Sequence, residues 1–348
     1  MKLDEEVERL LCCSFCKSDL VRHTDGFVCT SCGLRFPGRA VATGKDEEEV
    51  VFDFRILHPP YCLPEGLKSW ADAQSAYERT HEKGGERDSL QKYLDEIDSA
   101  REIYEVEYHL EGKVLDVGGH QGRLRHYLRT DVNLYVSIDP CIDVFSGITL
   151  QPNLLRAYPC LSEPCNFISA HAEYLPFKSG SFDWVHMRSA VDHFADPYLA
   201  LLEAYRCSRM GGKLLVGLAI VEKRAELERK RAGSSGRPVP TKPSLPVRVA
   251  RKLKRDGFLG LSRATAKTFR HKATPDGSAQ HSHDHMFRLT QGTLKDLFVR
   301  TGWDVVKEHW QKPPFQFCIY ACGQKQDPAP LAQPVAATSN AATKRPRG

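Results

Sequence analysis

The stretch Lys113–Leu128 constrains the fold of this chain more than any other part of the sequence. It reads K-V-L-D-V-G-G-H-Q-G-R-L-R-H-Y-L. Its apolar first residues predict a buried parallel strand, and its last six predict the start of an amphipathic helix. Between them, Gly118, Gly119 and Gly122 let the backbone turn sharply and approach a ligand closely. This order is typical of the ligand-binding first turn of a Rossmann-like sheet.

Two carboxylates near the turn, those of Asp116 and Asp139, indicate which ligand the turn would hold. Leu134–Ile138 predicts another strand and ends at Asp139, where a nucleotide-binding fold places the acceptor for ribose hydroxyls. The glycines read G-G-x-x-G rather than the dinucleotide pattern G-x-G-x-x-G. Asp116 precedes them, and its charge would repel a pyrophosphate but suits an ammonium or sulfonium group. Together these features favour S-adenosylmethionine, and the alternative is a glycine turn that merely closes an ordinary strand–helix unit.

Four further motifs follow in order: H-A-E-Y-L-P-F (171–177), S-F-D-W-V-H-M-R (181–188), D-H-F-A-D-P-Y-L-A-L-L-E-A-Y-R (192–206) and M-G-G-K-L-L-V (210–216). With the glycine turn, they resemble the class I S-adenosylmethionine-dependent methyltransferases, the methyltransferase type 11 group in particular. The resemblance covers residues 100–220 and resumes over 283–324. We therefore expect an α/β fold, with a seven-stranded Rossmann-like sheet, helices on both faces and an antiparallel last strand.

The resemblance also implies the cofactor contacts. The methionine end would be held by Asp116, Gly118, Gly119 and Gly122, the ribose by Asp139, and the adenine would be flanked by His171, Ala172 and Glu173. Ser189 would lie at the end of the fourth strand, under the methyl group. The sequence departs from the family at two positions: His120 replaces the middle glycine of the turn, and His171 stands where the family often has Asp.

The N-terminal segment carries two pairs of cysteines with metal-ligand spacing. Cys13-x-x-Cys16 and Cys29-x-x-Cys32 are separated by twelve residues, and four thiolates complete the tetrahedral shell of a structural Zn²⁺ ion. The alternatives are two chance pairs or a redox dithiol. The segment resembles the small zinc-ribbon proteins that partner tRNA and protein methyltransferases.

We expect four regions along the chain. They are a zinc ribbon over residues 1–45, a linker with N-terminal helices over 46–110, a methyltransferase domain over 111–324 and a disordered tail over 325–348, rich in Pro, Ala, Gln and Thr. No apolar run approaches the length of a membrane span. The N-terminus is acidic and is not a signal peptide, so the expected location is the cytoplasm, without a transmembrane segment.

The methyltransferase domain carries a basic insertion, expected over residues 222–285. Within it, Glu222–Lys272 contains sixteen Lys or Arg residues against four Asp or Glu residues, whereas the whole chain has a net charge of only +5. Such a segment can attract RNA, an anionic membrane surface or a phosphorylated substrate. The alternative is a solvated insertion without a partner.

Histidines at two places are candidates for the chemistry of methyl transfer. His193 follows the fourth strand, where the acceptor would lie, and His283 and His285 belong to the run H-S-H-D-H. Either site can remove a proton from an acceptor hydroxyl. The run can instead bind a metal or be a polar loop, and His193 can instead cap a helix. We expect O-methylation of a small-molecule or glycan-like acceptor, with an RNA methyltransferase or a non-catalytic adaptor as alternatives.

Overall fold

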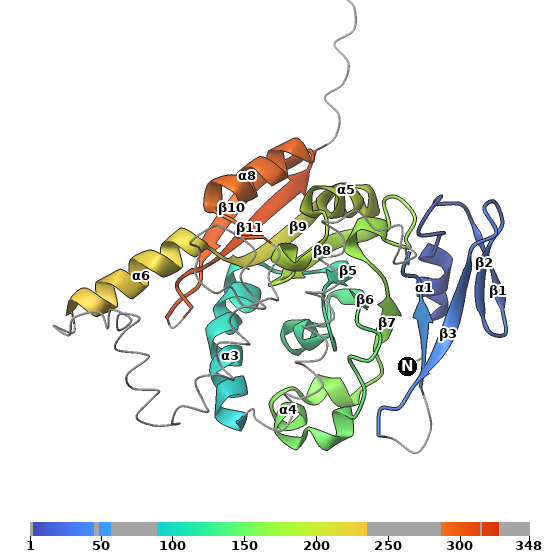
Figure 1. Cartoon of the computed structure of the whole chain (residues 1–348), viewed down its shortest axis with the longest axis horizontal. Coiled ribbons are helices and arrows are strands. Elements are labelled where there is room, and N and C mark those ends of the chain that lie inside the picture. The colour runs from blue at the N-terminus through green and yellow to red at the C-terminus, as the bar shows by residue number, and fades with distance from the viewer. Residues whose placement is uncertain (1–2, 45–48, 57–88, 235–286, 314, 327–348) are drawn as a thin grey trace, which may run out of the picture.

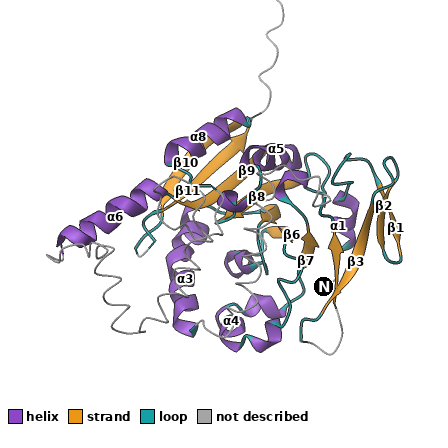
Figure 2. Cartoon of the chain, in the orientation of Figure 1, coloured by secondary structure: helices purple, strands orange, loops and turns teal. Residues whose placement is uncertain are grey.

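The computed structural model describes residues 3–44, 49–56, 89–234, 287–313 and 315–326, apart from the side chains of residues 228 and 231–234. Its described strands form one sheet, in the order β1-β2-β3-β4-β7-β6-β5-β8-β9-β11-β10 (Figures 1 and 2). The strands are β1 (Leu20–His23), β2 (Gly26–Cys29), β3 (Arg35–Val41), β4 (Glu49–Asp53), β5 (Gly112–Val117), β6 (Val132–Asp139), β7 (Asn166–Ser169), β8 (Phe182–Arg188), β9 (Ser208–Ala219), β10 (Trp303–Trp310) and β11 (Cys318–Lys325).

The expected Rossmann-like sheet corresponds to the strands from β7 to β10 in this order. β7, β6, β5, β8 and β9 pair in parallel. β11 pairs antiparallel with both β9 and β10, which confirms the expected antiparallel last strand. The fold class is therefore α/β, as predicted.

The sheet is longer than the expected seven strands, because the N-terminal strands continue it. β4 pairs in parallel with β7 through Phe52↔Ile168 and Asp53↔Ser169, and β3, β2 and β1 follow as antiparallel neighbours. An uncovered β7 would present a row of unpaired backbone groups at the sheet edge. β4 satisfies these groups, so the cysteine-bearing segment and the Rossmann-like sheet share one hydrogen-bonded sheet.

Helices cover both faces of the sheet. α3 (Leu90–Glu102), which continues into a π-helix over Ile103–Glu107, and α4 (Pro152–Ala157) lie on one side, whereas α5 (Pro197–Cys207) and α8 (Gln291–Arg300) lie on the other (Figure 1). Successive residues of a strand point to opposite faces, so β5 contributes Leu115 and Val117 to one buried cluster and Val114 to the other. Both faces of the central strands are therefore buried, as a parallel sheet requires.

The helix expected after the glycine turn is shorter than the sequence pattern indicates. The structure has a 3-10 helix of five residues over Arg123–Tyr127. Its backbone returns to an extended conformation at Leu128, since β6 begins shortly afterwards at Val132. The glycine turn therefore does not lead into a long helix with a strong dipole.

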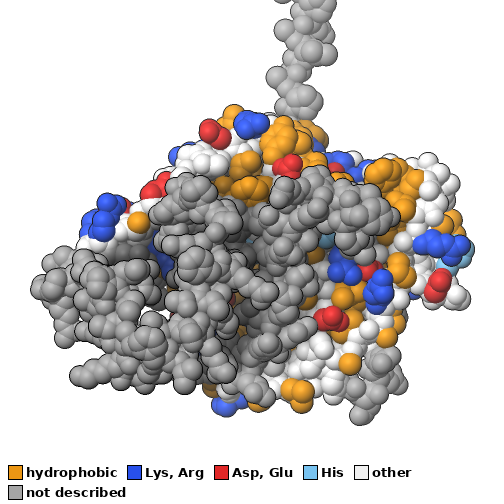
Figure 3. All heavy atoms as spheres, in the orientation of Figure 1, with side chains coloured by type: hydrophobic (Ala, Val, Ile, Leu, Met, Phe, Trp, Pro, Cys, Tyr) orange, Lys and Arg blue, Asp and Glu red, His pale blue; other side chains and the backbone are white. Residues whose placement is uncertain are grey.

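Two further helices flank the ends of the sheet. α1 (Glu5–Leu10) packs in the N-terminal segment, and α6 (Val221–Ser234) begins the basic insertion and projects from the body of the molecule (Figure 1). Arg224, Arg229 and Lys230 are exposed on α6, and Figure 3 shows Lys and Arg side chains at its surface. Among the described residues, no helix combines the length and the apolarity that a membrane crossing requires.

Candidate active site

The glycine turn after β5 adopts the conformation that its sequence predicts. Gly118 and Gly122 have φ of 70° and 79°, a left-handed region that glycine enters without steric cost. The N–H groups of Gly118 and Gly119 donate to the carbonyl of Ile138, which fixes the turn against β6. A Cβ atom on Gly118 would lie 2.6 Å from the Cβ of Ala190, so no other residue fits there without displacing the segment after β8.

His120, which replaces the middle glycine of the family pattern, also adopts a left-handed conformation, with φ of 49°. A side chain in this region costs about 1–2 kcal/mol relative to glycine. The turn retains its shape because the His120 carbonyl accepts a hydrogen bond from Ser137 Oγ at 3.1 Å, and its N–H donates to Asp139 Oδ2 at 3.2 Å. The substitution therefore leaves the course of the backbone intact at a local energetic cost.

Asp139 ends β6 with its carboxylate beside this turn. Oδ2 accepts from the N–H of His120, and Oδ1 accepts from the N–H of Cys141 at 2.9 Å. These two bonds fix the orientation of a side chain that is only 6% exposed. A carboxylate offers two oxygens as hydrogen-bond acceptors, and this is the chemistry that the two hydroxyls of a diol require.

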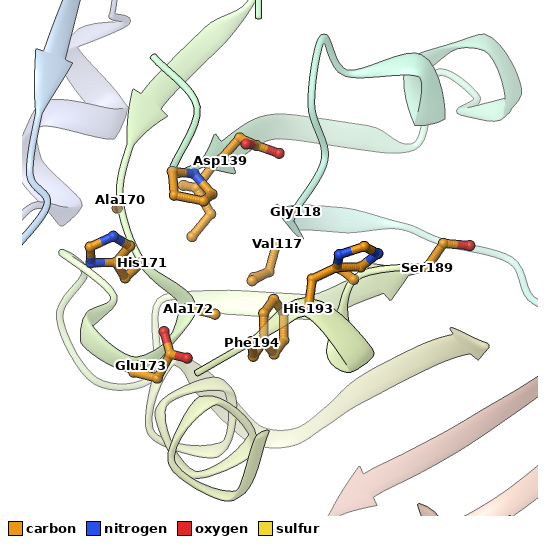
Figure 4. Close-up of a pocket in the computed structure, with 13 residues that line it drawn as sticks. Val117, Gly118, Asp139, Ala170, His171, Ala172, Glu173, Ser189, His193 and Phe194 are labelled. Atoms are coloured by element: carbon orange, nitrogen blue, oxygen red, sulfur yellow. The ribbon is translucent and has the colours of Figure 1, made fainter. Parts of the chain in front are cut away.

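A pocket brings together residues that follow several strands of the sheet (Figure 4). Its lining contains seven of the residues predicted for the site: Gly118, Asp139, His171, Ala172, Glu173, Ser189 and His193. Figure 4 shows His171 and Glu173 at one end and Ser189 at the other, with Gly118 and His193 between them. The convergence follows from the fold, since the carboxyl ends of parallel strands share one edge.

Residues that the sequence reasoning did not single out complete this lining: Val117, Ile138, Pro140, Ala170, Ala190 and Phe194. Most directly precede or follow a predicted site residue at a strand end. Their position in the chain therefore indicates that they lie near the site, whereas their apolar side chains do not indicate it.

Asp116, Gly119 and Gly122 do not line this pocket. The Asp116 carboxylate is buried, where Oδ2 accepts from the Tyr135 hydroxyl at 2.6 Å and Oδ1 lies 2.7 Å from His186 Nδ1. The other ring nitrogen of His186 lies 3.0 Å from the Tyr104 hydroxyl. Burial and the neighbouring Asp116 raise the pKa of Tyr135, so this hydroxyl keeps the proton that it donates. The carboxylate also lies close to the turn, since a Cβ atom on Gly119 would be 2.6 Å from it.

Glu173 places a buried carboxylate at the His171 end of the pocket. Its side chain is 6% exposed, and Oε1 accepts from the backbone N–H of Asp196 at 3.0 Å. Burial raises the pKa of this carboxyl, although backbone hydrogen bonds oppose the shift. A ligand group that donates to Glu173 would therefore compensate a charge that has little access to water.

Ser189 and His193 lie beyond the end of β8. Ser189 adopts a left-handed conformation with φ of 51°, and its N–H donates to the carbonyl of Gly217 at 2.8 Å. The 3-10 helix Val191–His193 follows at once and places the His193 ring in the pocket (Figure 4). His283 and His285 lie outside the described residues, as does most of the basic insertion.

The four cysteines predicted to bind metal lie together in the N-terminal segment. Their sulfur atoms are all within 4.8 Å of one another, with Cys13 Sγ 3.6 Å from Cys32 Sγ and Cys16 Sγ 3.4 Å from Cys29 Sγ. A tetrahedron with Zn–S bonds of about 2.3 Å requires sulfur separations of about 3.8 Å. Burial raises the pKa of Cys13 to about 12, so without a cation this sulfur stays protonated. The donor set fits Zn²⁺.

Comparisons with known proteins identify the part of the chain that contains this pocket. The family described as "Methyltransferase domain" matches residues 115–216. A curated protein that the chain resembles is the ubiquinone/menaquinone biosynthesis C-methyltransferase UbiE of Agrobacterium fabrum, which is 29% identical over 104 residues. That match covers 30% of this chain and 40% of the relative, so the chain spans less than half the length of that relative.

Solved structures also resemble the chain at low sequence identity. The 1,6-didemethyltoxoflavin-N1-methyltransferase of Burkholderia thailandensis, solved with S-adenosylhomocysteine, is 13% identical with a TM-score of 0.46, covering 79% of this chain and 95% of that one. The complex of the Haloferax volcanii Trm112 methyltransferase activator with a putative methyltransferase is 13% identical with a TM-score of 0.40, covering 75% and 98%. By the family match, residues 115–216, which contain the pocket lining, are similar to a methyltransferase domain.

Proposed function

We propose that this chain transfers a methyl group from S-adenosylmethionine to an acceptor oxygen. The observation that carries the proposal is the pocket itself: Gly118, Asp139, Glu173 and Ser189 follow four different strands and converge on one cavity inside the matched segment. A turn that admits close backbone approach, a carboxylate oriented by two N–H donors and a second, buried carboxylate are the groups that a nucleoside with a charged tail requires.

Residues at the ends of successive strands bind successive parts of the cofactor. The Gly118 turn receives the methionine end, and the carboxylate of Asp139 accepts the ribose hydroxyl protons. Ala172 and Glu173 contact the adenine, whose exocyclic amine donates to the buried carboxylate. His171 stands at the same end of the pocket (Figure 4), and we propose that its ring stacks on the base. Asp116, Gly119 and Gly122 contribute by holding the turn in place.

The acceptor side of the reaction is assigned to Ser189 and His193. Methyl transfer from a sulfonium is an in-line displacement, so the chain must align the acceptor oxygen and remove its proton. His193 lies in the pocket between Gly118 and Ser189 (Figure 4), and its imidazole is the proposed base for a hydroxyl. The acceptor class that we propose is a small or glycan-like molecule.

The N-terminal segment is proposed to bind one structural Zn²⁺ through Cys13, Cys16, Cys29 and Cys32. The bound ion would fix the two cysteine turns that flank β1 and β2. The first of these turns adjoins the segment that follows the adenine end of the pocket, because the N–H of the preceding Cys12 donates to the carbonyl of Pro176 at 2.9 Å. Zinc would therefore stabilise the fold on the side where the cofactor binds.

The test follows an isotopically labelled methyl group from S-adenosylmethionine into a cell extract, separated into small-molecule, RNA and protein fractions. We expect label in the small-molecule fraction, on oxygen, and its loss with the Asp139→Ala variant. Label in RNA would contradict the acceptor class but not the activity. Transfer that is absent with every fraction, despite intact cofactor binding, would favour a non-catalytic adaptor.

A further inference from the structure

A second pocket, which we name the Arg188 pocket, adjoins the cofactor pocket. It lies between α3, the ends of β8 and β9, and the start of β11. Its lining is Lys92, Glu96, Arg188, Ser189, Gly217, Leu218, Ala219, Gln311, Phe315, Phe317, Cys318 and Tyr320. Ser189 belongs to both linings, so a molecule in the Arg188 pocket would reach the Ser189 end of the cofactor pocket.

The charge of the Arg188 pocket is positive. Among the described residues that line it, Lys92 and Arg188 are the cations and Glu96 is the only carboxylate. The Glu96 carboxylate pairs with two arginines. Its Oε1 lies 3.3 Å from Arg188 Nη2, and its Oε2 lies 3.9 Å from Arg123 Nη1. A guanidinium carries five N–H donors in a planar fork, so one contact with a shared carboxylate leaves most of the capacity of Arg188 to bind an anion.

Arg188 is held in a partly enclosed position, in which its side chain is 24% exposed. It is the last residue of β8, where it pairs with Gly217 of the neighbouring strand β9. A Cβ atom on Gly217 would lie 2.5 Å from the ring of Tyr320, so glycine at this position makes room for the tyrosine. The guanidinium is thus anchored by the sheet, in an environment where a charged partner gains more than it would in open water.

The lining also includes aromatic side chains, those of Phe315, Phe317 and Tyr320. The rings of Phe315 and Phe317 are partly buried, with centroids 6.2 Å apart, and Arg224 lies over the face of Phe317 at 5.4 Å. Burial raises the pKa of the Cys318 thiol to about 11, so the sulfur is neutral and acts as an apolar surface at physiological pH. Rings and a fixed cation in one cavity fit a flat apolar body with a negative group.

We infer that the Arg188 pocket is the acceptor site, and that the acceptor is an organic anion whose carboxylate pairs with Arg188 while its aromatic or alkyl body contacts Phe315 and Phe317. The inference rests on the proposed function, which places the methyl donor on the other side of Ser189. It narrows the proposed small-molecule acceptor to a carboxylate-bearing compound, since an uncharged sugar would leave the guanidinium without an added partner.

The test is isothermal titration of the full chain, first with S-adenosylhomocysteine and then with naphthalene carboxylate or its uncharged carboxamide. We expect the carboxylate to bind about tenfold more tightly than the amide, as one charge-assisted hydrogen bond provides. Arg188→Gln should remove this preference. Glu96→Gln should strengthen carboxylate binding, because it removes the competing anion, and a folding defect cannot produce that increase.

Arg300→Gln is the matched control, since it removes an exposed arginine that lies over Tyr198 on α5; it should leave the preference unchanged. Equal affinity for carboxylate and amide, or a preference that survives Arg188→Gln, would overturn the inference. If S-adenosylhomocysteine binds but the protein does not discriminate between the carboxylate and the carboxamide, the acceptor site alone is overturned. Failure of S-adenosylhomocysteine itself to bind would overturn the proposed function.

Discussion

Lys17→Met is expected to loosen the N-terminal segment from the methyltransferase domain. The Lys17 ammonium donates to Glu203 Oε2 at 2.6 Å and to the carbonyls of Ser14 and Leu175 at 2.8 and 3.1 Å. Arg206 still holds both oxygens of Glu203 in the variant, at 2.7 and 2.9 Å, so the carboxylate is not left unpaired. The loss is one charge-assisted bond with its carbonyl contacts, about 2 kcal/mol.

Thermal and urea unfolding of the purified chain measure this loss. We expect a fall in melting temperature of about 4–8 °C. Lys178→Met is the matched control, since the Lys178–Asp19 pair also joins the two segments, at 3.3 Å, but its side chains are 48% and 78% exposed. An exposed pair contributes less than about 1 kcal/mol. Equal effects of the two substitutions would mean that the partly buried Lys17–Glu203 contact joins the segments no more strongly than the exposed pair does.

Three further predictions follow from the site and its supports. Freshly purified protein should contain about one Zn²⁺ per chain by elemental analysis, and a content near zero would contradict the zinc site. Gly119→Ala should destabilise the fold by about 1–3 kcal/mol, because its Cβ would lie 2.6 Å from the Asp116 carboxylate. Gly292→Ala in α8, where the nearest atom is 3.8 Å away, should be neutral or stabilising in the same urea titration. On acidification, protonation of Glu203 should lower the stability of the fold. Burial opposes the charge of this carboxylate, but Arg206 and Lys17 hold its pKa below the usual range. The stability that it provides is therefore complete above about pH 4.3 and is lost as the pH falls further; unfolding curves in which Glu203→Gln keeps the same acid dependence would contradict this assignment.

The convergence of Gly118, Asp139 and Glu173 on one pocket was the most predictable feature of the molecule. Gly118 and Asp139 are fixed by local signals, a glycine turn after one strand and a carboxylate after the next, and parallel strands bring their carboxyl ends to one edge. His171, Ala172 and Glu173 follow β7 in the same way. For these residues, the position in the chain already determines the position in space.

The hydrogen-bond partners of Asp116 could not be predicted, because they are remote in sequence. Tyr135 lies 19 residues away and His186 lies 70 residues away, and no local pattern marks either as a partner. A carboxylate before a glycine turn has the same sequence signature whether it faces a ligand or supports the turn from beneath. Only packing distinguishes these two roles.

The continuation of the sheet by the N-terminal strands also could not be predicted from the sequence. Within this segment, Phe36 stacks on Phe54, with the ring centroids 4.6 Å apart. The parallel pairing of β4 with β7 depends, however, on an exposed strand edge more than a hundred residues further along the chain. A sequence read in windows cannot identify which edge a strand will cover.

The proposed function requires that Asp139 binds the cofactor, and isothermal titration with S-adenosylhomocysteine measures this binding. Asp139→Ala removes both acceptors for the ribose hydroxyls and should weaken binding about a hundredfold or more. Asp143→Ala removes an exposed carboxylate from the loop that follows the same strand and should leave the affinity unchanged. Unaltered binding by the Asp139→Ala variant would contradict the proposed ribose contact of Asp139.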